Sequence, residues 1–201
     1  MVTLRAPSSL SATESSISIS PPQLSWLSGS WNVTHSTLPM WKKNRNVRIT
    51  YTPVTSSTPP QIDDVVTYQG LNSDALKTVR GLDKPFDVPN TAPPADAEGG
   101  AAGGIASLGY NWRGKGWLVI ATSKWEILGY GDEQDTGNSW VVTYFAKTLF
   151  TPAGIDFYSR KGNLAPQTID DIKAGLAGLG DHVAKLAGQI FEVKMDADTS
   201  G

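Results

Sequence analysis

The residues best suited to chemistry are one histidine, one tyrosine and one lysine. His35 ends the segment Trp31–His35, in which large and polar residues alternate. An imidazole there can donate to a carbonyl oxygen or move a proton near neutral pH. Tyr51 and Lys147 are the next catalytic candidates, because each can hydrogen-bond the polar end of a ligand. A structural, hydrogen-bonded role is the alternative for His35, and the sequence leaves open whether Tyr51 and Lys147 face inward.

A second group of residues could bind a hydrophobic small molecule. The segment Ser36–Arg45 carries Leu38, Met40 and Trp41, which a soluble protein rarely exposes together without purpose. Aromatic residues on the expected strands could wall a cavity, with tyrosine hydroxyls at its polar end. The aromatic candidates are Tyr68, Tyr110, Trp112, Trp125, Tyr144 and Tyr158. Ordinary core packing is the alternative for each, because one β-bulge inverts the facing of every later residue.

The composition excludes several other kinds of site. The chain of 201 residues has no cysteine and two histidines, so thiolate chemistry is excluded and a protein-built zinc site is not expected. It contains no nucleophile elbow, phosphate loop, dinucleotide-binding glycine fingerprint or zinc-protease motif. Glu126 and Asp156 are isolated acids, for which we expect surface positions. We therefore expect neither a metal nor a cofactor.

The charge balance limits the partners that the sequence predicts. Lys and Arg total 17 against 19 Asp and Glu, and the net charge of −2 supplies no overall basic field for nucleic acid or an anionic membrane. The N-terminus lacks the apolar run of a signal peptide, and no later segment is apolar enough to span a bilayer. We expect a cytoplasmic protein whose partner is a hydrophobic small molecule.

A meander of strands must position these candidates. Alternation such as that of Val47, Ile49 and Tyr51 predicts a strand with one buried face. Eight segments are expected as strands, at residues 31–35, 46–51, 64–69, 76–82, 105–112, 117–130, 140–150 and 155–160. Glycine- and proline-bearing turns at 113–116 and 151–154 join the later pairs. The sequence predicts an all-β, eight-stranded antiparallel up-and-down barrel with a C-terminal helix.

The ends of the chain complete the predicted organisation. Residues 1–22 are serine-rich and are expected to be a mobile arm, while residues 23–201 form a single domain. Residues 23–27 should make a helical turn over the barrel floor. Apolar residues recur at spacings of three and four from Ile169 to Ile190, which predicts a helix on the outer wall. We expect Thr168 to cap it, a break at Gly180 and Asp181 to cap the second piece. A partner-binding helix is the alternative.

This pattern resembles the lipocalin and calycin family. The motifs that carry the resemblance are Gly29-x-Trp31 in the first strand and Arg160 near the end of the last. The resemblance implies that Arg160 stacks on Trp31 and closes the floor, opposite a lid formed by Ser36–Arg45. The chain departs from secreted lipocalins in lacking a cysteine pair. A likeness to the haem-binding barrel nitrobindin would require an axial histidine near the C-terminus, where the chain has His182.

Two functions fit such a barrel. The first is a cofactor-free cyclase or isomerase of the Diels–Alder or hetero-Diels–Alder type, because the architecture resembles fungal secondary-metabolite cyclases. A cavity that folds a polyene or enone into one reactive shape can supply effective molarities of about 10⁵ M or more. The second is an intracellular carrier that stores a hydrophobic metabolite without changing it. Both require residues 31–160 to close into a barrel.

Overall fold

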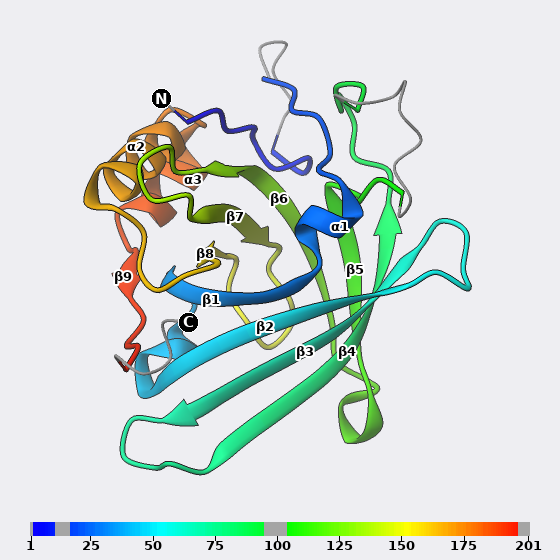
Figure 1. Ribbon diagram of the computed structural model, residues 1–201, viewed down its shortest axis with the longest axis vertical. Coiled ribbons are helices and arrows are strands. Elements are labelled where there is room, and N and C mark those ends of the chain that lie inside the picture. Colours follow the sequence, from blue (N-terminus) through cyan, green and yellow to red (C-terminus); the bar gives the residue numbers. More distant parts are fainter. Residues whose placement is uncertain (1, 11–16, 95–103, 197–201) are drawn as a thin grey trace.

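The first strand closes the barrel. In the computed structural model, which describes residues 2–10, 17–94 and 104–196, β1 (Gly29–Ser36) pairs with β2 (Asn44–Val54) on one side and β8 (Gly154–Ser159) on the other. Antiparallel pairing continues in chain order from β2 to β8 (Figure 1). The intervening strands are β3 (Gln61–Gly70), β4 (Leu76–Phe86), β5 (Gly109–Gly114), β6 (Thr122–Asp132) and β7 (Ser139–Phe145). The predicted eight-stranded up-and-down barrel is confirmed.

Two expected strands begin later than the sequence pattern indicated. The strand expected from residue 117 begins at Thr122, because residues 116–118 form the 3₁₀ turn η2 (Gly116–Leu118). Gly116 has φ of 65°, a left-handed conformation that interrupts an extended path. The strand expected from residue 105 begins at Gly109, and Ile105 makes only an isolated bridge to Gln23.

Two helices cover the outer wall of β7 and β8 (Figure 1). They are α2 (Pro166–Ala177) and α3 (Asp181–Ala187). Ile172 and Val183 are fully buried against the outward face of the barrel, which includes Val142 and Phe157. The expected outer-wall packing is thus confirmed. No helix in the described parts of the chain is long and apolar enough to cross a membrane.

The helix boundaries differ slightly from those expected. α2 begins at Pro166 instead of after Thr168, because a proline in the first helical turn loses no intrahelical hydrogen bond. The break falls at Gly180 as predicted, with φ of 100°, which favours glycine. Gly180 itself is the cap residue of α3, and Asp181 is the first helical residue, where its carboxylate complements the helix dipole.

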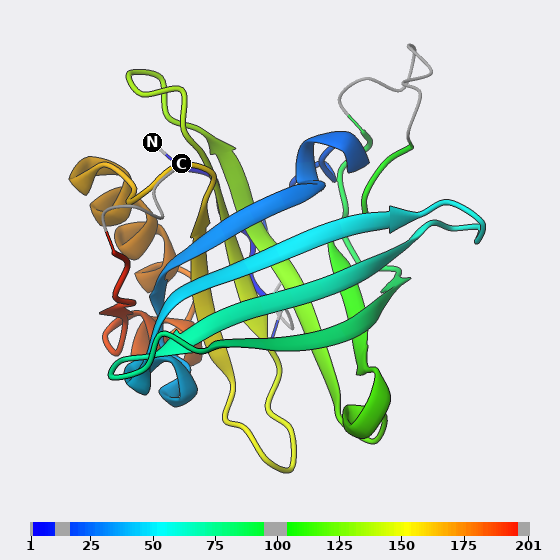
Figure 2. The same ribbon diagram turned by 60° about the horizontal axis from the view of Figure 1, so that its bottom comes forward.

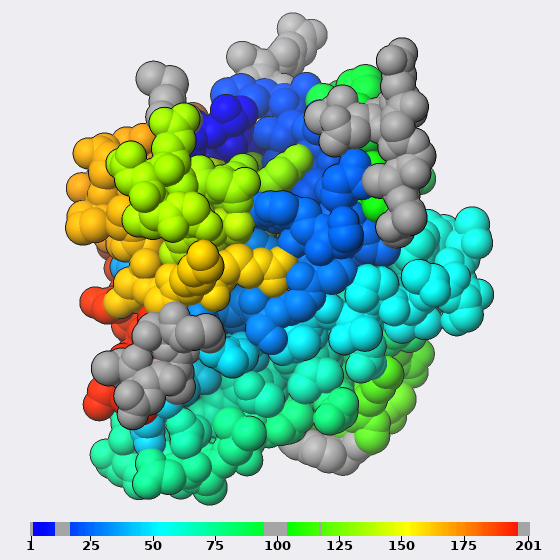
Figure 3. Space-filling model, in the orientation of Figure 1, coloured from blue at the N-terminus to red at the C-terminus, as the bar shows by residue number. Residues whose placement is uncertain are grey.

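The N-terminal segment differs from the expected mobile arm. Residues 2–10 lie against the outer face of β6 (Figure 3), where the Leu4 side chain is buried beside Gly129. Arg5 forms a buried ion pair with Glu126 and donates from Nε to the Ile127 carbonyl at 3.0 Å. The expected surface position of Glu126 is therefore wrong. Residues 1 and 11–16 lie outside the described residues, and the division into an arm and one domain stays a prediction.

The barrel floor is sealed by a cation on an indole. The Arg160 guanidinium lies 3.5 Å from the Trp31 ring centroid, and Trp31 is fully buried above α1 (Leu24–Leu27). Arg160 also donates to the carbonyls of Ser30 at 2.9 Å and Ser28 at 2.7 Å. Gly29 has φ of 91°, and a Cβ there would stand 3.2 Å from Arg160. The stacking implied by the family resemblance is confirmed.

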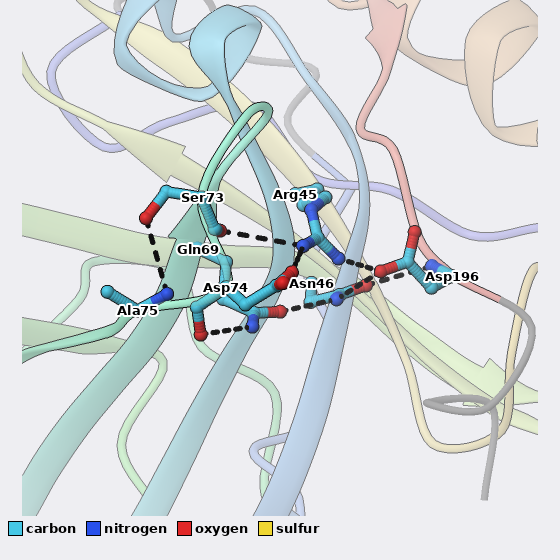
Figure 4. A network of polar contacts seen from close by, with 7 residues as sticks. All are labelled: Arg45, Asn46, Gln69, Ser73, Asp74, Ala75 and Asp196. Atoms are coloured by element: carbon cyan, nitrogen blue, oxygen red, sulfur yellow. Dashed lines mark hydrogen bonds and ion pairs between the residues drawn. The ribbon is translucent and has the colours of Figure 1, made fainter.

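A polar network fixes the start of β2 (Figure 4). Arg45 forms ion pairs with Asp74, from the β3–β4 connection, and Asp196, near the C-terminus. The Asn46 amide donates to Gln69 at 2.7 Å and to Asp196 at 2.8 Å. Three segments far apart in the sequence are therefore tied together immediately after the lid.

Replacing the floor cation should destabilise the whole barrel. In Arg160→Ala the carbonyls of Ser28 and Ser30 lose their charged donor and the Trp31 ring loses its cation. We expect a loss of about 2–4 kcal/mol in the free energy of unfolding, measured by chemical denaturation. The matched control is Lys161→Ala, which removes an exposed cation one residue away. Equal stabilities of the two variants would contradict the sealing role of Arg160.

Candidate ligand cavity

A cavity of about 680 Å³ occupies the barrel. The floor lies at α1, and the open end is formed by four connections, residues 37–43, 71–75, 115–121 and 146–153, on the opposite side (Figure 2). Eight side chains that the sequence singled out line it: Leu38, Met40, Trp41, Tyr51, Tyr68, Trp112, Trp125 and Tyr158. This size suits one small organic molecule.

The predicted lid folds over one side of the cavity. It contains the 3₁₀ turn η1 (Pro39–Lys43), and Trp41 points inward with its ring edge on Tyr68 at 5.5 Å between centroids. Leu38 is buried against Gly154, where a Cβ would clash with it. Met40 stays half exposed at the rim. The lid thus supplies apolar wall on its inner side and an apolar residue at the entrance.

His35 lies outside the cavity, contrary to the expected alternation. The pairing shifts between Val33, opposite Tyr158, and His35, opposite Phe157, so Thr34 is the extra residue of a β-bulge. The bulge turns His35 to the outer wall, where its ring lies 5.7 Å from that of Phe157. Burial, with a smaller contribution from Lys173, lowers the pKa of His35. We therefore assign His35 no part in cavity chemistry.

Three other candidates do not line the cavity. Lys147 is exposed in the β7–β8 connection. Tyr144 faces outward, with its ring 6.4 Å from that of His182 on α3, so neither residue reaches the barrel interior. Tyr110 faces inward but stacks beneath Trp125 at 4.8 Å, and its hydroxyl accepts a hydrogen bond from the Ser107 amide. Tyr110 supports the wall without forming its surface.

Three buried carboxyl groups that sequence reasoning missed face the barrel interior. They are Asp64 on β3, Asp83 on β4 and Asp156 on β8, and Asp64 and Asp156 line the cavity. The expected surface position of Asp156 is wrong. The sequence did contain a signal for Asp64. Asp64 lies two residues from both Ile62 and Val66, so in a strand it shares their buried face.

Asp156 joins the lid to the barrel. Its carboxyl accepts a hydrogen bond from the Ser36 hydroxyl at 2.5 Å and from the Trp41 indole at 3.4 Å. Burial raises the pKa of Asp156 to about 7, although both hydrogen bonds oppose that shift. Ser36 faces inward because it is the second residue after the bulge, opposite Asp156. The bulge that turns His35 out of the cavity therefore also turns Ser36 toward the interior.

Asp64 and Asp83 form the second part of the acidic site. Asp83 accepts from the Trp125 indole at 2.8 Å, while its other oxygen has no protein partner. One Asp64 oxygen also lacks a protein partner, and so does the hydroxyl of Tyr158, which lies beside Tyr51 without a well-aligned hydrogen bond. Burial, reinforced by Asp63, raises the pKa of Asp64 to about 7. Burial and Asp64 raise the pKa of Asp83 as well.

The site therefore offers neutral hydrogen-bond donors in an apolar cavity. Burial raises the pKa values of Tyr51 and Tyr158, so both phenols are protonated at neutral pH. A protonated Asp64 would add a carboxylic acid donor to the lining of the same cavity. Such a set can hold and polarise a carbonyl oxygen. Among the described residues there is no group of three or more metal-ligating side chains suited to hold an ion.

Comparisons with known proteins show the fold class. No family model matches the chain, and no curated protein sequence does. Lobster apocrustacyanin A1 is similar with a TM-score of 0.53 and 16% identity, over 85% of this chain and 78% of that one. The siderocalin Ex-FABP, described as functioning through dual ligand specificities, has a TM-score of 0.50 and 11% identity, over 85% and 94%. Both structures are of the lipocalin/calycin type, so the chain has a lipocalin-like fold.

The buried carboxyls should make stability depend on pH. The pKa of Asp156 is about 7 in the folded state against an ordinary 3.8, so the folded protein binds this proton more tightly than the unfolded chain. Its contribution is full below about pH 4 and is lost as pH rises through 7. We expect the free energy of unfolding to fall between about pH 4 and 8, with about 4 kcal/mol as the upper bound for Asp156 over that range.

The variant Asp156→Asn isolates this contribution. Its amide keeps an acceptor for Ser36 but cannot titrate, so the slope of unfolding free energy against pH should become shallower in denaturation experiments. Asp170→Asn, on the exposed side of α2, is the matched control and should keep the wild-type slope. An Asp156→Asn slope equal to that of wild type would contradict the raised pKa.

Proposed function

We propose that the cavity binds one hydrophobic small molecule whose carbonyl oxygen accepts a hydrogen bond from protonated Asp64. Two observations carry this proposal: Asp64 lines the cavity, and one of its buried carboxyl oxygens has no protein partner. The surrounding wall is mainly aromatic and aliphatic, and it includes Trp112, Trp125 and Val66. Burying an unpartnered polar group costs about 1–3 kcal/mol, so a ligand that satisfies it gains affinity and orientation.

The reaction that this arrangement supports best is a cofactor-free cyclisation of the Diels–Alder or hetero-Diels–Alder type. A hydrogen bond from Asp64 to an enone oxygen withdraws electron density from the conjugated double bond. Two new σ bonds then form from π electrons of the same molecule, with no leaving group and no redox partner. The cavity walls hold the linear precursor in its folded shape, which removes much of the entropic barrier.

The position of the acids favours catalysis over simple storage. An apolar side chain at Asp64 would bind a hydrophobic ligand without the desolvation cost that a carboxyl brings. The hydroxyls of Tyr51 and Tyr158 lie near this acid and can hold the same oxygen. His35 and Lys147, the other sequence candidates, are replaced in the proposal by Asp64, and Tyr51 is retained.

A non-catalytic carrier is the second candidate function. The extent of apolar wall favours it, since Ile49, Val66, Val79 and Phe145 all line the cavity. A carrier would bind the same class of molecule and return it unchanged. Whether a bound precursor is converted into a product therefore distinguishes the cyclase from the carrier.

Ligand binding should weaken more with rising pH when the ligand carries an oxygen that Asp64 can hydrogen-bond. Quenching of tryptophan fluorescence reports binding, because Trp41, Trp112 and Trp125 line the cavity. β-Ionone, a small hydrophobic enone, should bind about tenfold more weakly at pH 9 than at pH 6, because ionised Asp64 no longer donates. The hydrocarbon of the same skeleton without the ketone should lose less affinity, because only the desolvation of ionised Asp64 opposes its binding. The same pH dependence for both probes would contradict the role of Asp64.

Catalysis is tested with a linear triene that carries a terminal enone and cyclises slowly in buffer. The protein should accelerate formation of one stereoisomer, and the rate should fall as pH rises through about 7, where Asp64 ionises. Asp64→Leu should reduce the rate about tenfold to a hundredfold. Asp64→Asn keeps an N–H donor and should lose the pH dependence while retaining part of the rate.

The matched control is Asp87→Asn, an exposed acid just after β4, which should leave the rate unchanged. Tight binding of β-ionone without any acceleration of the triene cyclisation would contradict the cyclase function and would be consistent with the carrier function. Failure to bind either probe would contradict both functions.

A further inference from the structure

The rim of the cavity mouth carries most of the exposed apolar surface. Nine large apolar side chains are exposed in the described residues, and seven of them lie at or beside the four connections of the open end, called here the mouth rim. The most exposed are Leu149 at 95%, Ile120 and Phe150 at 86% and Leu76 at 65%. The η2 turn and the β7–β8 connection project on the same side in Figure 2. A soluble monomer rarely gathers so many apolar tips in one place.

Basic residues accompany these apolar tips. The four connections of the mouth rim contain Lys42, Lys43, Lys115 and Lys147, against a single acid, Asp74. Asp74 is paired with Arg45 and Lys115 with Asp63, so Lys42, Lys43 and Lys147 carry the argument. At the opposite end, the described connections after β4 and β6 contain Asp87, Glu133 and Asp135, and the chain after β8 adds the basic residues Arg160 and Lys161. The net charge of −2 therefore conceals an excess of lysines at the mouth rim. The net charge of the whole chain predicted no attraction to an anionic surface. The local excess of lysines predicts such an attraction for the mouth rim.

We propose that the mouth rim docks on an anionic lipid surface. Ile120 and Leu149 enter the boundary between headgroups and acyl chains, and the lysines lie against the negative headgroups. A ring of apolar tips from four separate connections matches a fluid apolar layer, because each tip inserts independently. The combination of apolar tips with lysines is the charge complementarity that such a surface requires.

The cavity opens in the middle of this surface. Met40 and Phe150 belong to both the cavity wall and the mouth rim. A hydrophobic molecule dissolved in the lipid can therefore pass into the barrel along continuous apolar wall without crossing water. The docking proposal concerns only the mouth rim, so it applies whether the protein is an enzyme or a carrier.

The test is cosedimentation of the full chain with lipid vesicles. Binding should be at least about tenfold tighter to vesicles of phosphatidylcholine with phosphatidylserine than to phosphatidylcholine alone. The double variant Ile120→Ser, Leu149→Ser should bind the mixed vesicles at least about tenfold more weakly. Neither residue lines the cavity, so quenching by β-ionone in solution should stay unchanged and show that the barrel is folded. The control Ile17→Ser alters an exposed apolar residue outside the mouth rim and should bind as wild type does.

A charge-reversal pair tests the lysines separately. Lys43→Glu with Lys147→Glu should weaken binding to the mixed vesicles at least about tenfold, whereas Lys161→Glu should not. Absence of wild-type binding, equal binding to both kinds of vesicle or full binding by the Ile120 and Leu149 variant would each overturn the proposal. The proposal would also be overturned if the wild type did not bind vesicles but formed a dimer, seen by light scattering, that the Ile120 and Leu149 variant dissociates. That result would assign the mouth rim to contact with a second copy of the chain.

Discussion

The site depends on how β1 pairs along its two edges. Because β1 hydrogen-bonds both β2 and β8, it closes the barrel and fixes which residues face the interior. The bulge at Thr34 then changes the facing within the strand. Trp31 and Val33 point inward on one side of the bulge and Ser36 points inward on the other, while His35 turns toward α2. One extra residue thus determines that Ser36, which anchors the lid, faces inward and that His35 faces outward.

Buried carboxyls are the second constraint on this barrel. Asp156 receives hydrogen bonds from Ser36 and Trp41, so the lid position and the protonation of this acid are linked. Burial raises the pKa values of both Asp64 and Asp83, with Asp63 adding to the shift of Asp64 and Asp64 adding to that of Asp83. Keeping three carboxyls in such a place lowers stability near neutral pH. Of the three, Asp64 is the one that both lines the cavity and has an oxygen without a protein partner, which is why the proposed ligand is assigned to it.

Much of the fold and part of the site follow from sequence patterns. Alternation along β2 and the Gly29-x-Trp31 and Arg160 pair predicted a closed barrel with a sealed floor, and the lid residues Leu38 and Trp41 line the cavity as expected. The failures have two physical causes. A bulge depends on pairing across strands, so the turn of His35 to the outer wall was not visible in β1 alone. Asp64 and Asp156 were missed because an isolated acid is usually exposed. Alternation with period two marked only Asp64 as inward, since Asp156 stands between the apolar residues Ile155 and Phe157.

The most direct test of the site is the titration of the Asp64 carboxyl carbon by NMR, with and without β-ionone. The pKa of Asp64 should be about 7 in the free protein, and it should rise further with the enone bound, because the ligand binds the protonated form. A pKa near the ordinary 3.8, or a pKa that the enone leaves unchanged, would contradict a protonated Asp64 that holds the ligand's oxygen.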